Sequence, residues 1–143
     1  MSQRVHSTST SPGEAAVDGL LNGLLAGLAM LAFLLVAGLL AGSPTLQTLR
    51  SLGWEKGGAP FAGVFAHLAV ASFYGLLWGP AWRWLHRHSA LPGWMLGVAY
   101  GILLFVLAQS LVHTLPAPLQ VLNANLLLAA HCVYGFTLGA ASR

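Results

Sequence analysis

Four long apolar segments constrain the fold of this chain more than any other feature of its sequence. They cover residues 19–42, 61–82, 93–113 and 119–140, and none has Asp, Glu, Lys or Arg in its central part. A helix rises about 1.5 Å per residue, so about 20 apolar residues cross the hydrocarbon core of a membrane. Lipid offers the backbone no hydrogen-bond partner, which leaves helices as the structure for such segments. We therefore predict an all-α membrane protein, a bundle of four transmembrane helices.

Composition supports a lipid-facing surface. Hydrophobic residues make up 57% of the chain and charged residues only 6%, whereas a soluble protein has roughly a quarter charged residues. The net charge of +3 rests on Lys and Arg near the ends of the predicted spans, which indicates membrane orientation and not nucleic-acid binding. Residues 1–13 are polar and predict a disordered cytoplasmic tail, followed by one domain over 14–143. The first span is too long for a signal-peptide core of ~7–15 residues.

The distribution of Arg and Lys predicts the orientation of the spans. Four Arg residues fall on the side shared by both termini and the 83–92 loop, and Arg50 and Lys56 fall on the other side. Cytoplasmic loops carry the excess of positive charge. We therefore expect a multi-pass protein of the bacterial inner membrane with both termini in the cytoplasm. The predicted interface anchors are Trp54, Trp78, Trp82, Arg83, Trp84, Arg87 and Trp94.

Local signals place the helix boundaries. Residues 11–14 (Ser-Pro-Gly-Glu) fit a capping box with Pro at the first helical position. Pro60, Pro92 and Pro118 each suit the first turn of a later span, and Pro80 is expected to kink or end the second. Within residues 43–60, Leu46, Leu49 and Leu52 recur every three residues, which predicts a short amphipathic helix on the outer surface anchored by Trp54. The alternative is a polar loop.

The first and third spans share a spacing of glycines, and the second and fourth share a spacing of His and small residues. The odd spans read GxxxGxxxG and the even spans read His-xxx-small-xxx-Gly. The positions are Gly19, Gly23 and Gly27; Gly93, Gly97 and Gly101; His67, Ala71 and Gly75; and His131, Gly135 and Gly139. Because small residues let membrane helices approach closely, we predict helix-packing faces within the bundle. Contact with a partner subunit or a flat cofactor is the alternative. The pattern also predicts a duplicated two-helix hairpin with parallel halves.

A Gly-rich first span, a His that opens the second and the run HCVYGFTLG in the fourth resemble certain small, uncharacterised bacterial inner-membrane proteins. The resemblance covers most of the chain, through motifs made of small residues and His. It implies a four-helix membrane fold and implies no activity.

Three histidines lie within or at the end of a span, where an ionisable side chain is a functional candidate. They are His67, His131 and, at the outer end of the third span, His113. One interpretation is structural: neutral rings that hydrogen bond across the bundle, with no cofactor and no metal. A second is a haem b with His67 and His131 as axial ligands. A third is a proton or quinone site.

No catalytic residues are evident. The acids are Glu14, Asp18 and Glu55, none of them deep in a span, which excludes a proton-coupled exporter of the small multidrug type. Cys132 is the single cysteine, so chemistry through a Cys pair is excluded. The sequence also has no HExxH motif and no phosphate-binding loop.

We therefore expect a non-catalytic accessory or structural subunit of a larger membrane complex, of the respiratory or photosynthetic kind. Its partners would be the lipid bilayer and other membrane subunits, not nucleic acid. One alternative is an electron-transfer protein with a haem b or quinone site at His67 and His131. A second is a small homo-oligomeric transporter.

Overall fold

The chain folds into long helices. The computed structural model describes residues 11–42, 49, 59–112 and 123–142. The long helices in this part are α1 (Pro12–Leu40), α3 (Pro60–His88), α4 (Gly93–Val112) and α5 (Ala124–Ala141). All four are long and apolar enough to cross a membrane, by length and composition. The prediction of an all-helical protein with four such helices is therefore confirmed.

The ends of α1 follow from its sequence. The Ser11 side chain accepts a hydrogen bond from the backbone N–H of Glu14, and the Glu14 carboxylate accepts one from the backbone N–H of Ser11. Pro12 occupies the first turn, where its missing N–H costs nothing. Beyond the other end, Gly42 adopts a φ of 73°. A side chain makes that left-handed conformation costly, so glycine is the usual residue just past a helix end.

The end of α3 differs from the sequence-based expectation. α3 continues through Pro80 and ends at His88, so Pro80 does not end the helix. Membrane helices tolerate Pro when neighbouring groups satisfy the freed backbone carbonyl. α5 begins at Ala124 in the described part of the chain, where the Asn123 side chain accepts from the backbone N–H of Asn125 and caps the helix. The expected start at residue 119, with Pro118 in its first turn, lies outside the described residues. The amphipathic helix expected within residues 43–60 falls outside the described residues, apart from Leu49 and the start of α3.

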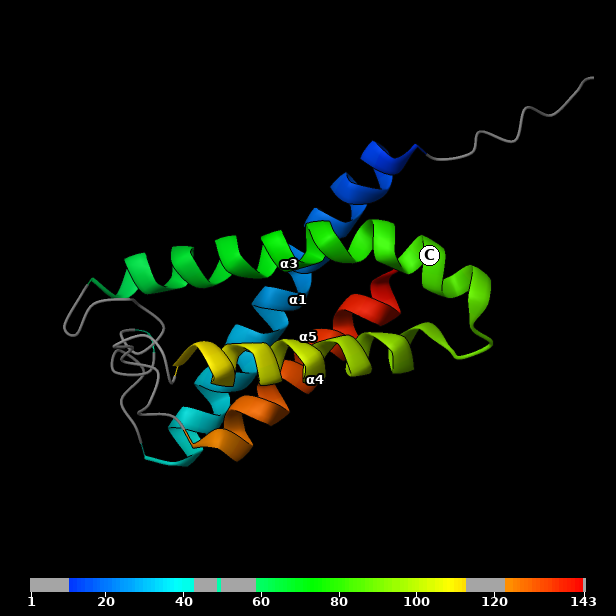
Figure 1. Cartoon of the computed structure of the whole chain (residues 1–143). Coiled ribbons are helices and arrows are strands. Elements are labelled where there is room, and N and C mark those ends of the chain that lie inside the picture. The colour runs from blue at the N-terminus through cyan, green and yellow to red at the C-terminus, as the bar shows by residue number, and fades with distance from the viewer. Residues whose placement is uncertain (1–10, 43–48, 50–58, 113–122, 143) are drawn as a thin grey trace, which may run out of the picture.

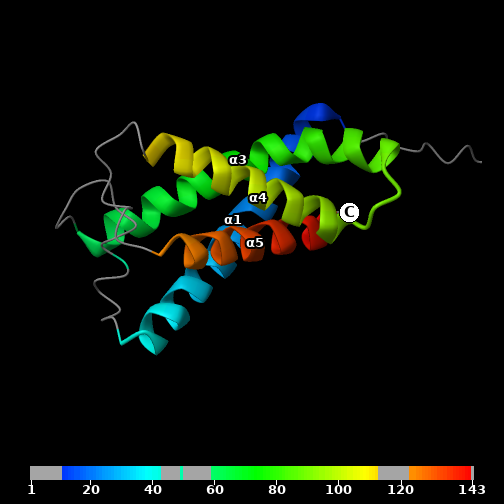
Figure 2. The ribbon, with the colours of Figure 1, turned by 60° about the horizontal axis from the view of Figure 1, so that its bottom comes forward.

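The helices form two layers that cross. α1 and α5 run side by side in one layer, and α3 and α4 lie in the other (Figures 1 and 2). α1 also packs along α3, and α4 along α5. The described backbones of α3 and α4 make no comparable approach. The start of α1, the end of α3, the start of α4 and the end of α5 share one end of the bundle (Figure 1).

The two helices of each hairpin, α1 with α3 and α4 with α5, pack backbone against backbone where they cross. A Cβ added at Gly23 of α1 would lie 2.7 Å from both the carbonyl oxygen of Ala71 and the Cα of Gly75 in α3. A Cβ added at Gly97 of α4 would likewise lie 2.7 Å from the Cα of Gly139 in α5. Real Cβ atoms are essentially never this close to backbone atoms. Both helix pairs therefore depend on glycine at the crossing.

The two crossings match position for position. Gly23 of α1 and Gly97 of α4 hold the same position in the two GxxxGxxxG patterns. Gly23 meets Ala71 and Gly75, and Gly97 meets Gly135 and Gly139, which hold the same two positions in the His-xxx-small-xxx-Gly patterns. Further close approaches include Gly19 with Gly75 and Gly79, Gly27 with Ala71, Gly93 with Gly139, and Gly101 with His131 and Gly135. Each hairpin thus closes with the same register of small residues.

Large side chains fill the space between the two hairpins. Trp78 and Leu34 are each 1% exposed, and Leu138 is fully buried. The Trp78 ring lies 4.9 Å from the ring of Tyr100, measured between centroids, and 5.8 Å from that of Trp82. This aromatic cluster packs side chains of α3 against α4.

Candidate functional site

His67 joins the two helices of the first hairpin. It lies on α3, and its Nε2 is 3.1 Å from the carbonyl oxygen of Gly27 on α1. With Nε2 protonated, the ring donates this hydrogen bond across the helix pair. The crossing glycines bring α1 close enough for the ring to reach its backbone. His67 therefore acts as a polar link between α1 and α3.

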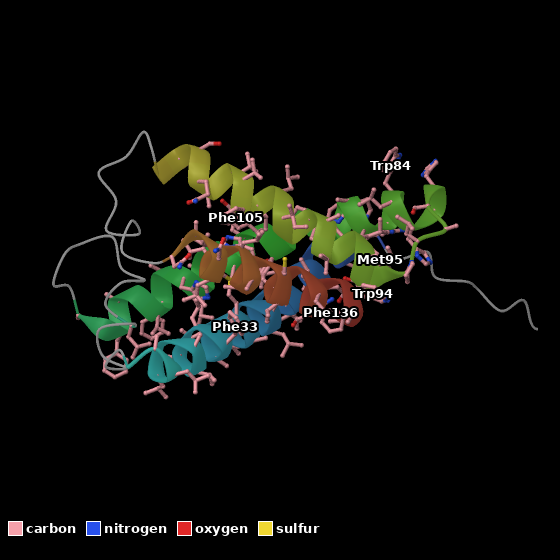
Figure 3. The ribbon with its side chains drawn as sticks, turned by 90° about the horizontal axis from the view of Figure 1, so that it is seen from below. Phe33, Trp84, Trp94, Met95, Phe105 and Phe136 are labelled. Carbon is pink, nitrogen blue, oxygen red and sulfur yellow. The ribbon has the colours of Figure 1, made fainter. Side chains whose placement is uncertain are left out.

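His131 uses its ring differently. Its Nδ1 lies 2.8 Å from the carbonyl oxygen of Leu127, one turn earlier on the same helix α5. The Phe105 ring of α4 meets the His131 ring edge-on, with centroids 5.7 Å apart. Figure 3 shows Phe105 on α4, where it lies over α5. Donation from Nδ1–H leaves Nε2 as the acceptor nitrogen of a neutral ring.

Two tyrosines hold the hairpins together by donating to backbone carbonyls of α3. Tyr134 of α5 donates to the carbonyl oxygen of Ala71 at 2.7 Å, and Tyr100 of α4 donates to that of Tyr74 at 2.9 Å. Tyr134 is only 3% exposed. Its role was not predicted from the sequence, although a residue three positions after His131 shares a helix face with it.

Trp78 makes the third polar link between hairpins. Its indole N–H donates to the hydroxyl oxygen of Ser142 at 2.8 Å, and that hydroxyl donates to the carbonyl of Leu138 at 2.8 Å. Among the described residues, every buried side-chain nitrogen or oxygen has a hydrogen-bond partner. The polar groups inside the bundle therefore serve mainly to connect helices.

The predicted interface anchors divide into two groups. Trp84 and Trp94 are 63% and 48% exposed, and Trp94 lies beside Phe136 of α5 (Figure 3). Trp78 and Trp82 are instead 1% and 8% exposed and belong to the core. Both rings face inward. The ring of Trp82 lies against Gly93 of α4, where a glycine leaves room for it. Arg83 and Arg87 lie near the end of α3, and Trp54 falls outside the described residues.

The structure places two of the three candidate histidines in half-buried positions of the bundle, one on α3 and one on α5. His113 falls outside the part of the chain that the structure describes. No three His, Cys, Asp or Glu side chains among the described residues lie close enough to share a metal ion. Each of these two rings uses one nitrogen for a backbone carbonyl, which leaves Nδ1 of His67 and Nε2 of His131 as the nitrogens that a ligand could meet.

Comparison of the chain with known protein families, with characterised proteins and with solved structures finds no match. The geometry of the bundle is therefore the basis for any functional assignment.

Proposed function

We propose that this chain is a non-catalytic accessory subunit of a larger membrane complex, of the respiratory or photosynthetic kind. The observation that carries the proposal is the use of the polar side chains inside the bundle. His67, Tyr100 and Tyr134 each bind a backbone carbonyl of a neighbouring helix, and Trp78 binds Ser142. Groups used in this way hold helices in fixed positions. They support a scaffolding role better than a chemical one.

The lateral surface supports the same proposal. Large apolar side chains point outward along α3 and α4, including Phe73, Leu77 and Leu103, which are 57%, 48% and 53% exposed. The backbones of α1 and α5, which form one layer, pack closely together. The backbones of α3 and α4, which form the other layer, lie farther apart and are joined by side chains. A helix of another subunit could pack on this less closed side and gain contacts there.

We also infer that the fold arose from a duplicated hairpin, lies in the bacterial inner membrane and has both termini in the cytoplasm. The matching register of the two glycine crossings supports duplication. The shared end of the bundle carries Arg83 and Arg87, and cytoplasmic ends of membrane helices are enriched in Arg and Lys. The resemblance to small bacterial inner-membrane proteins points to the same location.

Purification in a mild detergent, followed by mass spectrometry of the co-eluting proteins, tests the subunit proposal. We expect the chain to elute with a reproducible set of membrane proteins in fixed ratio. An unrelated four-helix membrane protein with the same tag and expression level is the control for adventitious partners. Elution as a lone, monodisperse species under the mildest conditions would contradict the proposal.

A haem b or quinone site is the second candidate, and one observation favours it. Metal-binding His residues usually donate their other ring N–H to a carbonyl, and the Nδ1 of His131 lies 2.8 Å from the carbonyl of Leu127. His67 does not share this arrangement, because its Nε2 lies against the carbonyl of Gly27. Axial ligation by both would require the His67 ring to leave that carbonyl. An absorption spectrum of the purified protein decides: a Soret band that is lost in H131F would favour this candidate.

A further inference from the structure

A pocket lies at the end of the bundle where α1 begins and where α3 and α5 end. Its volume is about 410 Å³, and it is lined by residues of α1, α3 and the end of α5. We call it the end pocket. Sites for small ligands have volumes of roughly 300–1,000 Å³, so the end pocket can hold a ligand group and not only water. The histidines inside the bundle do not line it.

Small residues at the glycine crossing create the space. Gly19 of α1 and Gly79 of α3 both line the end pocket, and a Cβ on Gly19 would lie 2.8 Å from the backbone nitrogen of Gly79. Ala15 and Ala141 add two more small side chains. The backbone at these small residues therefore forms part of the pocket surface, and the longer side chains of α1 and α3 form the rest.

Positive charge is concentrated on the wall that α3 supplies. Arg83 and Arg87 both line the end pocket, and residues four apart lie on one face of a helix. His86 also lines it, and its ring is stacked on Trp82 at a centroid distance of 4.9 Å. Guanidinium groups bind phosphate through parallel charge-assisted hydrogen bonds. The α3 wall therefore suits a phosphate group.

The α1 wall adds acceptors and an apolar rim. Asp18 and Asn22 line the end pocket and offer carboxylate and amide oxygens to hydroxyl groups. Leu21, which also lines it, is 56% exposed. Leu25 and Leu28 continue this exposed strip along α1, with exposed fractions of 53% and 46%. The end pocket thus opens onto an outward apolar surface along which an acyl chain can lie.

We propose that the end pocket binds the headgroup of an anionic phospholipid. The phosphate lies at Arg83 and Arg87, the headgroup hydroxyls meet Asp18 and Asn22, and an acyl chain follows Leu21 and Leu25. Asp18 disfavours a bare phosphate by repulsion but accepts hydrogen bonds from hydroxyls, which favours a glycerol headgroup. Basic pockets between membrane helices on the cytoplasmic side are suited to such lipids. This site is independent of the subunit role proposed above.

Native mass spectrometry of the delipidated, detergent-purified full chain tests the site. The probes are phosphatidylglycerol and phosphatidylcholine with identical acyl chains. We expect phosphatidylglycerol to bind about tenfold more tightly, which is the discrimination of one good charge-assisted contact. Inorganic phosphate is the third probe. Its displacement of phosphatidylglycerol at equal concentration would overturn the lipid assignment in favour of a soluble anion.

Two variants distinguish specific binding in the end pocket from a general attraction between the positively charged protein and an anionic lipid. R87Q should remove about tenfold of the affinity for phosphatidylglycerol and leave that for phosphatidylcholine unchanged. R50Q is the matched control, because it removes the same charge at a residue that the sequence places at the opposite end of the spans. Arg87 is exposed near the end of α3, so the R87Q protein should keep its helix content by circular dichroism. Equal loss of binding in R50Q and R87Q, or no preference between the two lipids in the wild-type protein, would overturn the proposal.

Discussion

His67 of α3 and His131 of α5 hold corresponding places in the two His-xxx-small-xxx-Gly patterns, but their rings bind different carbonyls. The His67 ring reaches across to Gly27 of α1, whereas the His131 ring returns to Leu127 of its own helix. A bond between helices stabilises tertiary structure, and a bond within one turn competes with hydrogen bonds that the helix already makes. The two side chains therefore differ in how much they contribute to stability.

We predict that H67F lowers the free energy of unfolding more than H131F does. Side-chain hydrogen bonds between membrane helices contribute about 0.6 kcal/mol on average, so the loss in H67F should be of this order. Unfolding of both variants in mixed detergent micelles measures the difference. A larger loss in H131F would show that this ring has a partner beyond its own helix. A Soret band lost in either variant would instead support the haem candidate.

Tyr134 gives a second prediction at this scale. Y134F removes only the hydroxyl that donates to Ala71, at a residue 3% exposed. We expect a loss of about 0.6 to 1.7 kcal/mol, which runs from the average to the largest value measured for such bonds in membranes. Y100F, which removes the partly buried bond to Tyr74, is the matched comparison and should cost less. Equal, negligible effects would mean that the hairpins are held together by ring packing alone.

At the scale of the helices, the glycine crossings are the points of least tolerance. We predict that G97A destabilises the protein by about 1–3 kcal/mol, the usual cost of overpacking, because the added Cβ would meet the backbone of α5. G13A is the control within a helix. The nearest atom to its added Cβ is the Ser11 Oγ at 3.8 Å, so the change should be neutral or stabilising. Thermal melting in detergent compares the two, and a G97A protein as stable as G13A would contradict the crossing.

The sequence predicts the helices well because apolar length and capping are local properties. The start of α1 follows from Ser11 and Glu14 alone. The sequence does not predict which way Trp78 and Trp82 face, because an aromatic residue near a span end suits either the membrane interface or a space inside the bundle. Small residues on α4 and α5 decide this, and only the assembled hairpins show it. Pro118 is the stronger sequence signal for a helix start, although the described part of α5 is capped by Asn123.

The candidate sites depend still more on tertiary structure. The His spacing suggested His67 and His131, but the choice between a bond across helices and one within a helix depends on how closely each neighbour approaches. The end pocket combines Asp18 of α1 with Arg83 of α3, which are far apart in the chain. No spacing rule joins two such residues until antiparallel packing of α1 and α3 is known.

At the scale of the whole molecule, the orientation of the bundle can be tested directly. We predict that a Cys placed at Ser89, in a C132S background, is protected from an impermeant thiol reagent applied to the outer face of intact cells. Ser89 lies at the end of the bundle that carries Arg83 and Arg87. Permeabilised cells provide the control, in which the same Cys should react. Labelling of intact cells would show that this end faces outward.

The unequal lengths of the helices have a consequence for the membrane itself. Within the part of the chain that the structure describes, α1 and α3 have 29 residues each, whereas α4 has 20 and α5 has 18. At about 1.5 Å per residue, the first pair is about 43 Å long and the second about 27–30 Å, close to the thickness of a hydrocarbon core. The surplus of the first pair is polar at the end with Glu14, Asp18, Arg83 and Arg87. In the orientation proposed here, α1 and α3 would rise as a two-helix step above the bilayer surface while α4 and α5 end level with it. A protein that binds this end of the bundle would therefore contact the side of the projecting α1–α3 pair as well as the membrane surface.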